Sequence, residues 1–392
     1  MNYYERALEL KDETIANRRH IHKNAETGLD LPKTKAYVME KLTEYGLEPK
    51  DCGYGVTATL GKGGKVLLLR ADMDALPVTE ATGLPFSSRH EGCMHACGHD
   101  IHTSNLLTVA EILNRTKDQW KGKVKLVFQP AEENGGGGRE MIKAGLMDEI
   151  PDACFALHVE NGVPGKIVVG SRYLTAYSDS YKITVHGKAA HSSTPEEGVD
   201  AVYIAASIVT ALHGIISRNL SPMDRATLNV GMIHGGTAPN IIADEVTLGV
   251  MLRNLSKESR EAMMKKIETI SNGIAESMGG SCDLAFRAGY AAVYNDEKFS
   301  DFVAATFRKY EDIIHEDLGD GKPEDWLITG EHPLLGAEDF GFYSQKAPSC
   351  MIWVGVGGNS PKHSPGFCID ERYIKLCTRA MAMTALEYLT KE

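Results

Sequence analysis

Four short apolar runs in this chain end in, or are followed by, acidic residues or histidines. The runs cover residues 66–70, 124–130, 154–159 and 350–357. Short apolar runs that alternate with longer amphipathic segments are typical of an α/β fold with a mostly parallel sheet flanked by helices. Ligands of such sheets bind beyond the carboxyl ends of the strands. We therefore expect a common crevice lined by Asp72, Asp74, Glu132, Glu133, His158 and His363.

A nine-residue segment, Met94–His102, contains three histidines, a cysteine and an aspartate. Burying so many metal-binding groups together is costly unless a cation compensates. Cys97 and His99 are two residues apart, so both can point at one centre from a loop or an extended turn. A structural zinc knuckle would need a second Cys-x-x-Cys or His-x-x-x-His pair downstream, which the chain lacks. The segment therefore predicts a metal site that takes part in chemistry, and a buried cysteine among surface histidines is the alternative.

The length of the chain predicts two domains, because 392 residues are many for one hydrophobic core. Residues 179–289 have the order β-α-β-β-α-β of a split-βαβ or ferredoxin-like module. Since His363 comes after this module, we interpret it as an inserted domain, and residues 1–178 and 290–392 as one discontinuous catalytic domain. The strands of the module are expected near 181–186, 226–233, 245–252 and 282–287, and its helices near 200–218 and 256–278.

Composition narrows the classes of partner. The formal net charge is −11 and no basic tract is present, which argues against nucleic acid or an anionic membrane. The first residues lack the layout of a signal peptide, and no apolar stretch approaches the ~18 residues of a membrane helix. The eight cysteines are scattered rather than arranged as a disulfide framework. We expect a cytoplasmic enzyme with a small-molecule substrate.

Five motifs occur along the chain in a diagnostic order. They are Asp72–Pro77, Met94–Asp100, Glu132–Glu133 with its glycine run, Leu157–His158 and His363–Pro365. This order resembles a family of co-catalytic metal-dependent amidohydrolases. The family contains hippurate hydrolase, N-acyl-amino-acid amidohydrolases, N-acetyldiaminopimelate deacetylase and plant auxin-conjugate hydrolases, and it is more distantly similar to aminoacylase and glutamate carboxypeptidases. The resemblance spans almost the whole chain.

The resemblance implies two divalent ions per subunit. Such ions polarise a carbonyl and lower the pKa of a water toward ~7. Imidazole, carboxylate and sulfur ligands suit Zn, Mn, Co or Ni, so the metal is left open. Asp74 resembles a carboxylate that orients a ligand from behind, although it could instead cap the turn before Pro77. A lone His158 would more often be a hydrogen-bonded core residue. The ligands implied by the resemblance are Cys97, His99, Glu133, His158 and His363.

Glu132 is the predicted general acid and base. Neighbouring side chains of a regular strand point to opposite faces. At a strand end that turns into a glycine loop, however, Glu133 can bind metal while Glu132 reaches the attacking water and passes its proton to the leaving amine. The alternative is that one of the two glutamates is a solvated loop acid.

The inserted domain resembles the lid and dimerisation domain of the family. His191 lies in a segment like the lid histidine motif, and Asn240 in one like the glycine-rich asparagine turn; both are expected to bind the oxyanion or the substrate. Arg253 could pair with a substrate carboxylate. The alternatives are a helix-capping role for His191 and a surface role for Arg253. Because the apolar face of the helix at 200–218 is wider than one sheet requires, we expect a twofold homodimer through residues 179–289.

One departure from the family pattern leaves the substrate open. Relatives usually have His-x-x-Pro-Glu-Leu after the first helix, whereas this chain has Ala25 in place of the proline and Leu31 in place of a later acid. We expect hydrolysis of an N-acyl amino acid, with a dipeptidase, a carboxypeptidase-like enzyme or an N-acetyldiaminopimelate deacetylase as alternatives. A non-catalytic, metal-bound peptide-binding protein is less favoured, and a zinc nucleobase deaminase would need a Pro-Cys-x-x-Cys motif that is absent. Aromatic residues that could line an acyl pocket are Phe340, Phe342, Tyr343 and Trp353.

Overall fold

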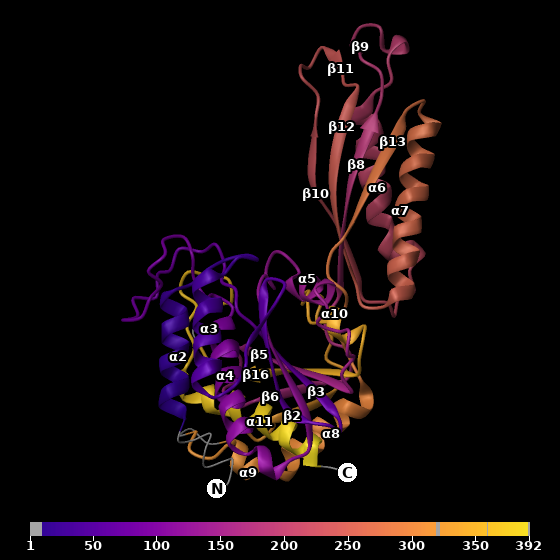
Figure 1. The fold of residues 1–392 in the computed structure, drawn as a ribbon. Helices are drawn as coiled ribbons and strands as arrows, with labels where there is room; N and C mark the ends of the chain where they lie inside the picture. The colour runs from indigo at the N-terminus through magenta and orange to yellow at the C-terminus, as the bar shows by residue number, and fades with distance from the viewer. Residues whose placement is uncertain (1–9, 319–321, 359, 391–392) are drawn as a thin grey trace. The chain divides into compact units, whose positions relative to one another are not determined.

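The computed structural model describes residues 10–318, 322–358 and 360–390 (Figure 1). The described residues form two compact units. Unit 1 lies within Met1–Leu174, Tyr294–His332 and Asp339–Glu392, and unit 2 within Thr175–Val293 and Pro333–Glu338. The range expected for the inserted domain, 179–289, falls inside unit 2.

Unit 1 contains an eight-stranded sheet in the order β1-β2-β4-β3-β5-β16-β6-β15. The central strands β4, β3, β5 and β16 pair in parallel, as do β6 and β15, whereas β1–β2, β2–β4 and β16–β6 are antiparallel. The predicted mostly parallel α/β class is therefore confirmed. The strands of the sheet are β1 (Lys50–Cys52), β2 (Gly55–Lys62), β3 (Val66–Asp72), β4 (Gly122–Gln129), β5 (Ala153–Glu160), β6 (Ile167–Gly170), β15 (Leu327–Gly330) and β16 (Ser349–Gly355).

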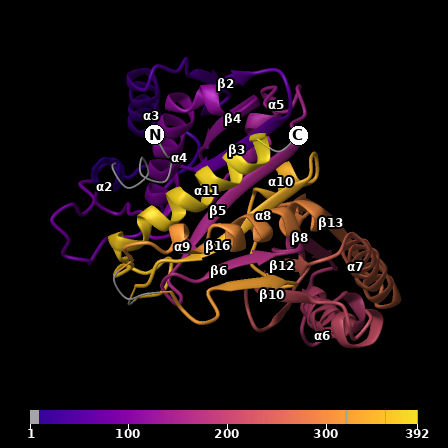
Figure 2. The ribbon, with the colours of Figure 1, turned by 90° about the horizontal axis from the view of Figure 1, so that it is seen from below.

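Helices cover the main core of unit 1. Helix α4 packs on β3, α11 on β5 and α8 on β16, and Figure 2 shows α11, in yellow, lying along the sheet. A separate pair of short strands, β7 (Arg172–Tyr173) and β14 (Tyr294–Asn295), is antiparallel. The helices of unit 1 are α2 (Lys11–Lys23), α3 (Pro32–Glu44), α4 (His99–Arg115), α5 (Gly137–Lys143), α8 (Glu297–Lys309), α9 (Glu311–Ile314), α10 (Gly341–Ser344) and α11 (Ile374–Thr390).

The central strands place different residues on their two faces. Leu67 and Leu69 of β3 belong to the hydrophobic core beneath α4 and α11. Arg70 and Gln129 are just as buried, but they lie on the opposite face because successive side chains of a strand alternate. A strand that reads as a simple apolar run therefore carries a polar group on its second face.

Unit 2 has the predicted β-α-β-β-α-β order. Its four-stranded antiparallel sheet runs β10-β12-β8-β13, and α6 and α7 pack against it. Two short strands, β9 (Ala190–His191) and β11 (Ile241–Ile242), pair with each other. The main elements are β8 (Tyr177–His186), α6 (Ala201–Asn219), β10 (Ala226–Gly235), β12 (Glu245–Asn254), α7 (Lys257–Ser277) and β13 (Ser281–Ala288).

Helix α6 differs from one expectation. By length and composition alone it could cross a membrane, although we expected no segment of that kind. The apolar residues of α6 are interrupted by polar ones, so the helix contains no long run of consecutive apolar residues. Ile204, Ile208 and Leu212 are buried against the sheet of unit 2. A core helix meets the same criterion, so α6 is weak evidence for a membrane partner.

A buried ionic network ties α2 to the rest of unit 1. The His22 imidazole lies 2.9 Å from Asp100 through Nδ1 and 3.3 Å from Glu80 through Nε2. Burial alone would lower the pKa of His22, but its hydrogen bonds to Asp100 and Glu80 outweigh burial and raise it. Burial would raise the pKa of Glu80, yet hydrogen bonds led by that of His22 lower it to about 2. The pair therefore favours the imidazolium form.

We predict that His22 makes the stability of unit 1 depend on pH. Because its folded pKa lies above the unfolded value of 6.5, the stabilisation is complete below pH ~6.5 and is lost as pH rises through the folded pKa. Replacing His22 with Gln should reduce the free energy of unfolding more at pH 6 than at pH 9, by about 1.4 kcal/mol for each unit of pKa difference. Urea denaturation at both pH values measures this.

The exposed His332 provides the control. His332→Gln should leave the pH dependence of the unfolding free energy unchanged. If the unfolding free energies of the wild type and His22→Gln depended on pH in the same way, the predicted role of His22 would be wrong.

Candidate metal centre

Two groups of potential ligand atoms meet at Cys97. The ligand atoms of Cys97, His99 and His158 all lie within 4.8 Å of one another, and so do those of Cys97, Glu133 and His363. All five residues belong to unit 1. The structure therefore brings together the five ligands implied by the sequence resemblance, in two sets that share the cysteine sulfur.

Backbone carbonyls fix the orientation of two of the histidines. Nδ1 of His99 donates to the carbonyl of Asp74 at 2.9 Å, and Nδ1 of His158 donates to the carbonyl of Val159 at 2.6 Å. A carbonyl only accepts, so each Nδ1 carries a proton, and Nε2 is the ring nitrogen that remains to bind a metal. Nε2 of His99 is buried and has no hydrogen-bond partner among the described residues. This orphaned acceptor fits a bound cation.

Burial sets the protonation of the other donors. Burial raises the pKa of the Cys97 thiol well above its ordinary range, and burial lowers that of His158 well below its own. Burial alone would lower the pKa of His99, but the charge of Asp72 outweighs burial and raises it. Burial alone would raise the pKa of Glu133. The contact of its carboxylate with Nε2 of His363, at 3.3 Å, helps to lower the pKa instead. A divalent ion would compensate a Cys97 thiolate here, as a metal does for coordinating thiols.

The other histidines of Met94–His102 have different surroundings. His102 donates from Nδ1 to Asp72 at 2.6 Å and accepts at Nε2 from the Val159 amide at 2.9 Å. Both of its nitrogens are therefore used, and although it lies close to Asp72 and His99 it offers no free lone pair. His95 is buried and lies outside the groups of potential ligands.

Asp74 positions three site residues at once. Its two carboxylate oxygens accept from the amides of Glu132 and Glu133 at 2.9 and 3.0 Å, and its carbonyl accepts from His99. Asp74 thus contacts two backbone amides through its carboxylate and a candidate ligand histidine through its carbonyl, which are the contacts of a group that orients a metal centre from behind.

A tight turn directs both glutamates toward the centre. Ala131 has a φ of 53°, and its carbonyl accepts the amides of Gly135, Gly136 and Gly137. A Cβ on Gly137 would lie 1.7 Å from the carbonyl oxygen of Pro130, so only glycine permits this turn. Strained backbone of this kind is concentrated at functional sites. Here it brings Glu132, which is buried, and Glu133 within ligand distance of His99.

Unit 2 brings two of its three predicted residues together. His191 pairs with Ile241 across β9 and β11, and the carbonyl of Asn240 accepts from the Ser192 amide at 3.1 Å. His191 is exposed and bonds to Ser193 rather than capping a helix.

Arg253 lies at the other end of the sheet of unit 2. It pairs with Ser178 on β8, whereas the His191 end of β12 begins at Glu245. Eight residues of strand separate the two ends, roughly 26 Å at ~3.3 Å per residue. Nη1 of Arg253 is buried without a hydrogen-bond partner among the described residues, which argues against a plain surface charge. One small substrate cannot contact both ends of a single copy of unit 2.

The aromatic residues considered for an acyl pocket lie in different surroundings. Phe340 and Tyr343 are fully buried. The Trp353 ring lies 5.3 Å from that of His158, edge to face. Trp353 therefore packs against a candidate ligand.

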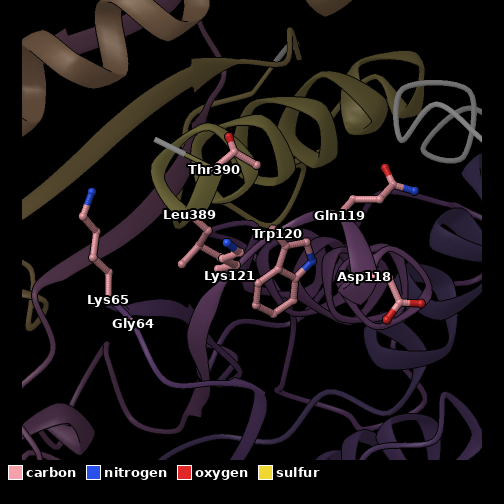
Figure 3. Close-up of a pocket in the computed structure, with 8 residues that line it drawn as sticks. All are labelled: Gly64, Lys65, Asp118, Gln119, Trp120, Lys121, Leu389 and Thr390. Carbon is pink, nitrogen blue, oxygen red and sulfur yellow. The ribbon is translucent and has the colours of Figure 1, made fainter. Parts of the chain in front are cut away.

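A separate cavity of about 400 Å³ lies next to Trp120 (Figure 3). Gly64 and Lys65 line it and precede β3, whereas the candidate ligands lie at or beyond the carboxyl ends of the strands. It contains none of the predicted site residues and is not the candidate centre. Its lining is Gly64, Lys65, Asp118, Gln119, Trp120, Lys121, Leu389 and Thr390.

Three buried polar residues beside the centre, Arg70, Gln129 and Asp339, are not among the residues predicted from the sequence. Arg70 lies at the end of an apolar run, and a charge in such a run was the one available signal. Asp339 has no local signal, because its partners are distant in the chain: Arg70 is 269 residues away.

The fold and the site together define a metal-dependent hydrolase of the amidohydrolase and peptidase type. Residues 68–387 match Peptidase family M20/M25/M40, and the chain belongs to this family.

Curated relatives match over nearly the whole chain. Thermostable carboxypeptidase 2 of Saccharolobus solfataricus is 34% identical, covering 98% of this chain and 97% of the relative. Hippurate hydrolase of Campylobacter jejuni is also 34% identical, covering 99% and 100%. N-acetyl-L-cysteine deacetylase of Bacillus subtilis is 34% identical, covering 93% and 85%.

Solved structures with a similar fold also match over nearly the whole chain. A putative aminohydrolase from methicillin-resistant Staphylococcus aureus has a TM-score of 0.91 at 33% identity and covers all of both chains. A dinuclear metal-binding M20 peptidase from Bacillus subtilis has a TM-score of 0.83 at 28% identity, covering 97% of this chain and 99% of that one.

We predict that Gly98 is required between Cys97 and His99. Its φ is 94°, and a Cβ there would lie 2.3 Å from Cγ2 of Val159. Gly98→Ala should therefore lower metal affinity at least ~10-fold, the usual scale for disturbing ligand orientation. Isothermal titration with Zn²⁺ measures the affinity.

Gly92 is a matched control, with a φ of 73° and nothing within 4 Å of an added Cβ. Gly92→Ala should lower the free energy of unfolding by about 1–2 kcal/mol, because alanine is strained in the left-handed backbone conformation. It should keep the metal affinity of the wild type. Equal metal affinities in the two variants would show that the contact with Val159 is unimportant.

Proposed function

We propose that this protein hydrolyses the amide bond of N-acyl amino acids. The observation that carries the proposal is the pair Glu132 and Glu133, both held by Asp74 beside the ligand groups. This arrangement allows Glu133 to bind metal while Glu132 carries a proton. Relatives named hippurate hydrolase and N-acetyl-L-cysteine deacetylase support an acylated amino acid as the substrate.

The proposed cofactor is a pair of divalent ions, Zn, Mn, Co or Ni. When bound, the ions would polarise the substrate carbonyl and lower the pKa of a water. One ion would be held by His99 and His158 and the other by Glu133 and His363, with Cys97 shared between them, as the two groups of ligand atoms indicate. The mixed nitrogen, oxygen and sulfur donor set fits these metals.

Glu132 carries the proton in the proposed reaction. Its carboxylate accepts a proton from the attacking water and donates it to the amide nitrogen as the C–N bond breaks. His191 and Asn240 stabilise the negative oxygen of the tetrahedral intermediate through hydrogen bonds. Arg253, whose buried Nη1 has no hydrogen-bond partner in the described part of the chain, binds the substrate carboxylate.

Two alternatives, a carboxypeptidase and an N-acetyldiaminopimelate deacetylase, have support of the same kind. Carboxypeptidase 2 and an N-acetyldiaminopimelate deacetylase of Streptococcus uberis are 34% and 35% identical to this chain. A dipeptidase and a metal-bound peptide-binding protein without turnover are further alternatives. The five free cysteines that are buried suit a reducing, cytoplasmic location, which is part of the proposal.

We propose a homodimer that forms through unit 2. Strand β10 is an edge of its sheet, and Met232 and Ile233 on this strand are 57% and 54% exposed. Tyr203 on α6 is 64% exposed. An unpaired edge with apolar side chains is a natural surface for a twofold partner.

We predict that Glu132 is needed for turnover and Cys97 for metal binding. Glu132→Gln should keep metal binding but lose at least ~100-fold in kcat, because the proton carrier is removed. Cys97→Ala should lose metal affinity, because a shared ligand is removed. Metal analysis and amino-acid release from N-acetyl, N-benzoyl, N-acetyldiaminopimelate and dipeptide substrates measure both effects.

Chelated wild-type protein should be inactive and recover with Zn, Mn or Co. The proposal is wrong if metal-free protein is fully active, or if none of the four substrate classes is hydrolysed by metal-loaded protein. Equal metal loss in Glu132→Gln and Cys97→Ala would mean that the two roles are exchanged.

We predict that His191 acts on the centre of the partner subunit. Neither His191→Ala nor Glu132→Gln homodimers should be active. Mixed dimers should recover part of the activity, because one centre combines an intact Glu132 with an intact His191 from the partner subunit. Activity after subunit exchange, which is followed by native mass spectrometry, measures the effect. No recovery despite proven exchange would place His191 at the centre of its own subunit.

A further inference from the structure

The Arg70 guanidinium occupies an unusual position for a cation. It lies in β3, a central strand of the unit 1 sheet, and is 1% exposed. Three of its nitrogens donate to three different side chains. Nη1 donates to Asp72 at 2.6 Å, Nη2 to Asp339 at 2.6 Å, and Nε to Gln129 at 3.1 Å. The planar fork of an arginine can satisfy such divergent acceptors at the same time.

The Asp72 contact leads to the His158 side of the candidate centre. The second oxygen of Asp72 accepts from Nδ1 of His102 at 2.6 Å. Nε2 of His102 in turn accepts from the amide of Val159 at 2.9 Å. Val159 directly follows His158 on β5, so this chain of hydrogen bonds holds the strand end that presents the ligand.

The Asp339 contact leads to the glutamate side. Asp339 accepts from the amide of Gly138 at 3.0 Å and from the side chain of Gln129 at 2.8 Å. Its own amide lies 3.4 Å from Oε1 of Glu132, to which it donates. Asp339 therefore holds both the proposed proton carrier and the end of the glycine turn that follows Glu132 and Glu133.

We infer that Arg70 is a positioning residue. It holds the His158 side and the Glu132–Glu133 side of the centre in a fixed position relative to each other. It acts through Asp72 and Asp339, whose hydrogen bonds extend to the strand end beside His158 and to Glu132. Without it, two buried carboxylates would lie close together with no cation between them. The inference rests on the metal centre of the proposed function, but not on the identity of its substrate.

Conservative replacement tests the inference. Arg70→Lys keeps the charge but cannot present the fork, so we expect a 10–100-fold lower affinity for Zn²⁺, the usual effect of removing a group that orients ligands. The visible spectrum of the Co²⁺-loaded protein should also change, because the ligand geometry is disturbed. Asp339→Asn should move both readouts in the same direction.

Arg379 is a matched control, because it is also 1% exposed and lies on α11, where it donates to the carbonyl of Glu316 at 2.8 Å. Arg379→Lys should lower the thermal midpoint of the metal-free protein but leave Zn²⁺ affinity and the Co²⁺ spectrum unchanged. A merely structural role for Arg70 would give the same result as Arg379→Lys.

Wild-type affinity and spectrum in folded Arg70→Lys would overturn the inference. If Arg70→Lys does not fold, the same two measurements on Asp339→Asn decide it, and wild-type values there would overturn it. Neither readout needs a substrate. A wild-type protein that binds metal but hydrolyses no amide would therefore contradict the proposed function and leave this test intact.

Discussion

Asp72 and Asp339 can be buried together because the guanidinium of Arg70 lies between them. Removing an unpaired carboxylate from water costs several kcal/mol, and two close carboxylates also repel each other. Burial opposes ionisation of Asp72, yet the charges of His99 and Arg70 and the hydrogen bond from His102 hold its pKa well below the usual range. The second face of β3 and β4 is therefore polar near the carboxyl ends of these strands, and the candidate ligands lie beside that polar region.

The centre itself depends on backbone groups as much as on side chains. Carbonyls orient His99 and His158, and two adjacent amides hold Asp74. The left-handed turn at Ala131 allows consecutive glutamates to approach one region, which a regular strand would prevent. Preorganisation of this kind reduces the reorganisation that a bound ion or substrate must induce.

Membership of the M20 family and the two-unit architecture narrow the chemistry to amide and peptide hydrolysis. Within unit 2, His191 and Asn240 lie at one end of the sheet and Arg253 at the other. This separation is the physical reason that a single copy of unit 2 cannot surround a small substrate with all three residues. A dimer would resolve the separation, because two copies can present opposite ends.

The sequence by itself determined the α/β class, the order of elements in unit 2 and the residue types of the candidate ligands. These follow from local periodicity and from the close spacing of Cys97 and His99, which survive in any fold that buries the apolar runs. The tertiary structure alone decided that His102 has no free nitrogen while His99 does, and that Arg70 meets Asp339 across 269 residues. A sequence shows that a charge lies in an apolar run. Which buried partner compensates that charge depends on the packing of segments far apart in the chain, because desolvation is relieved only by groups within hydrogen-bond reach.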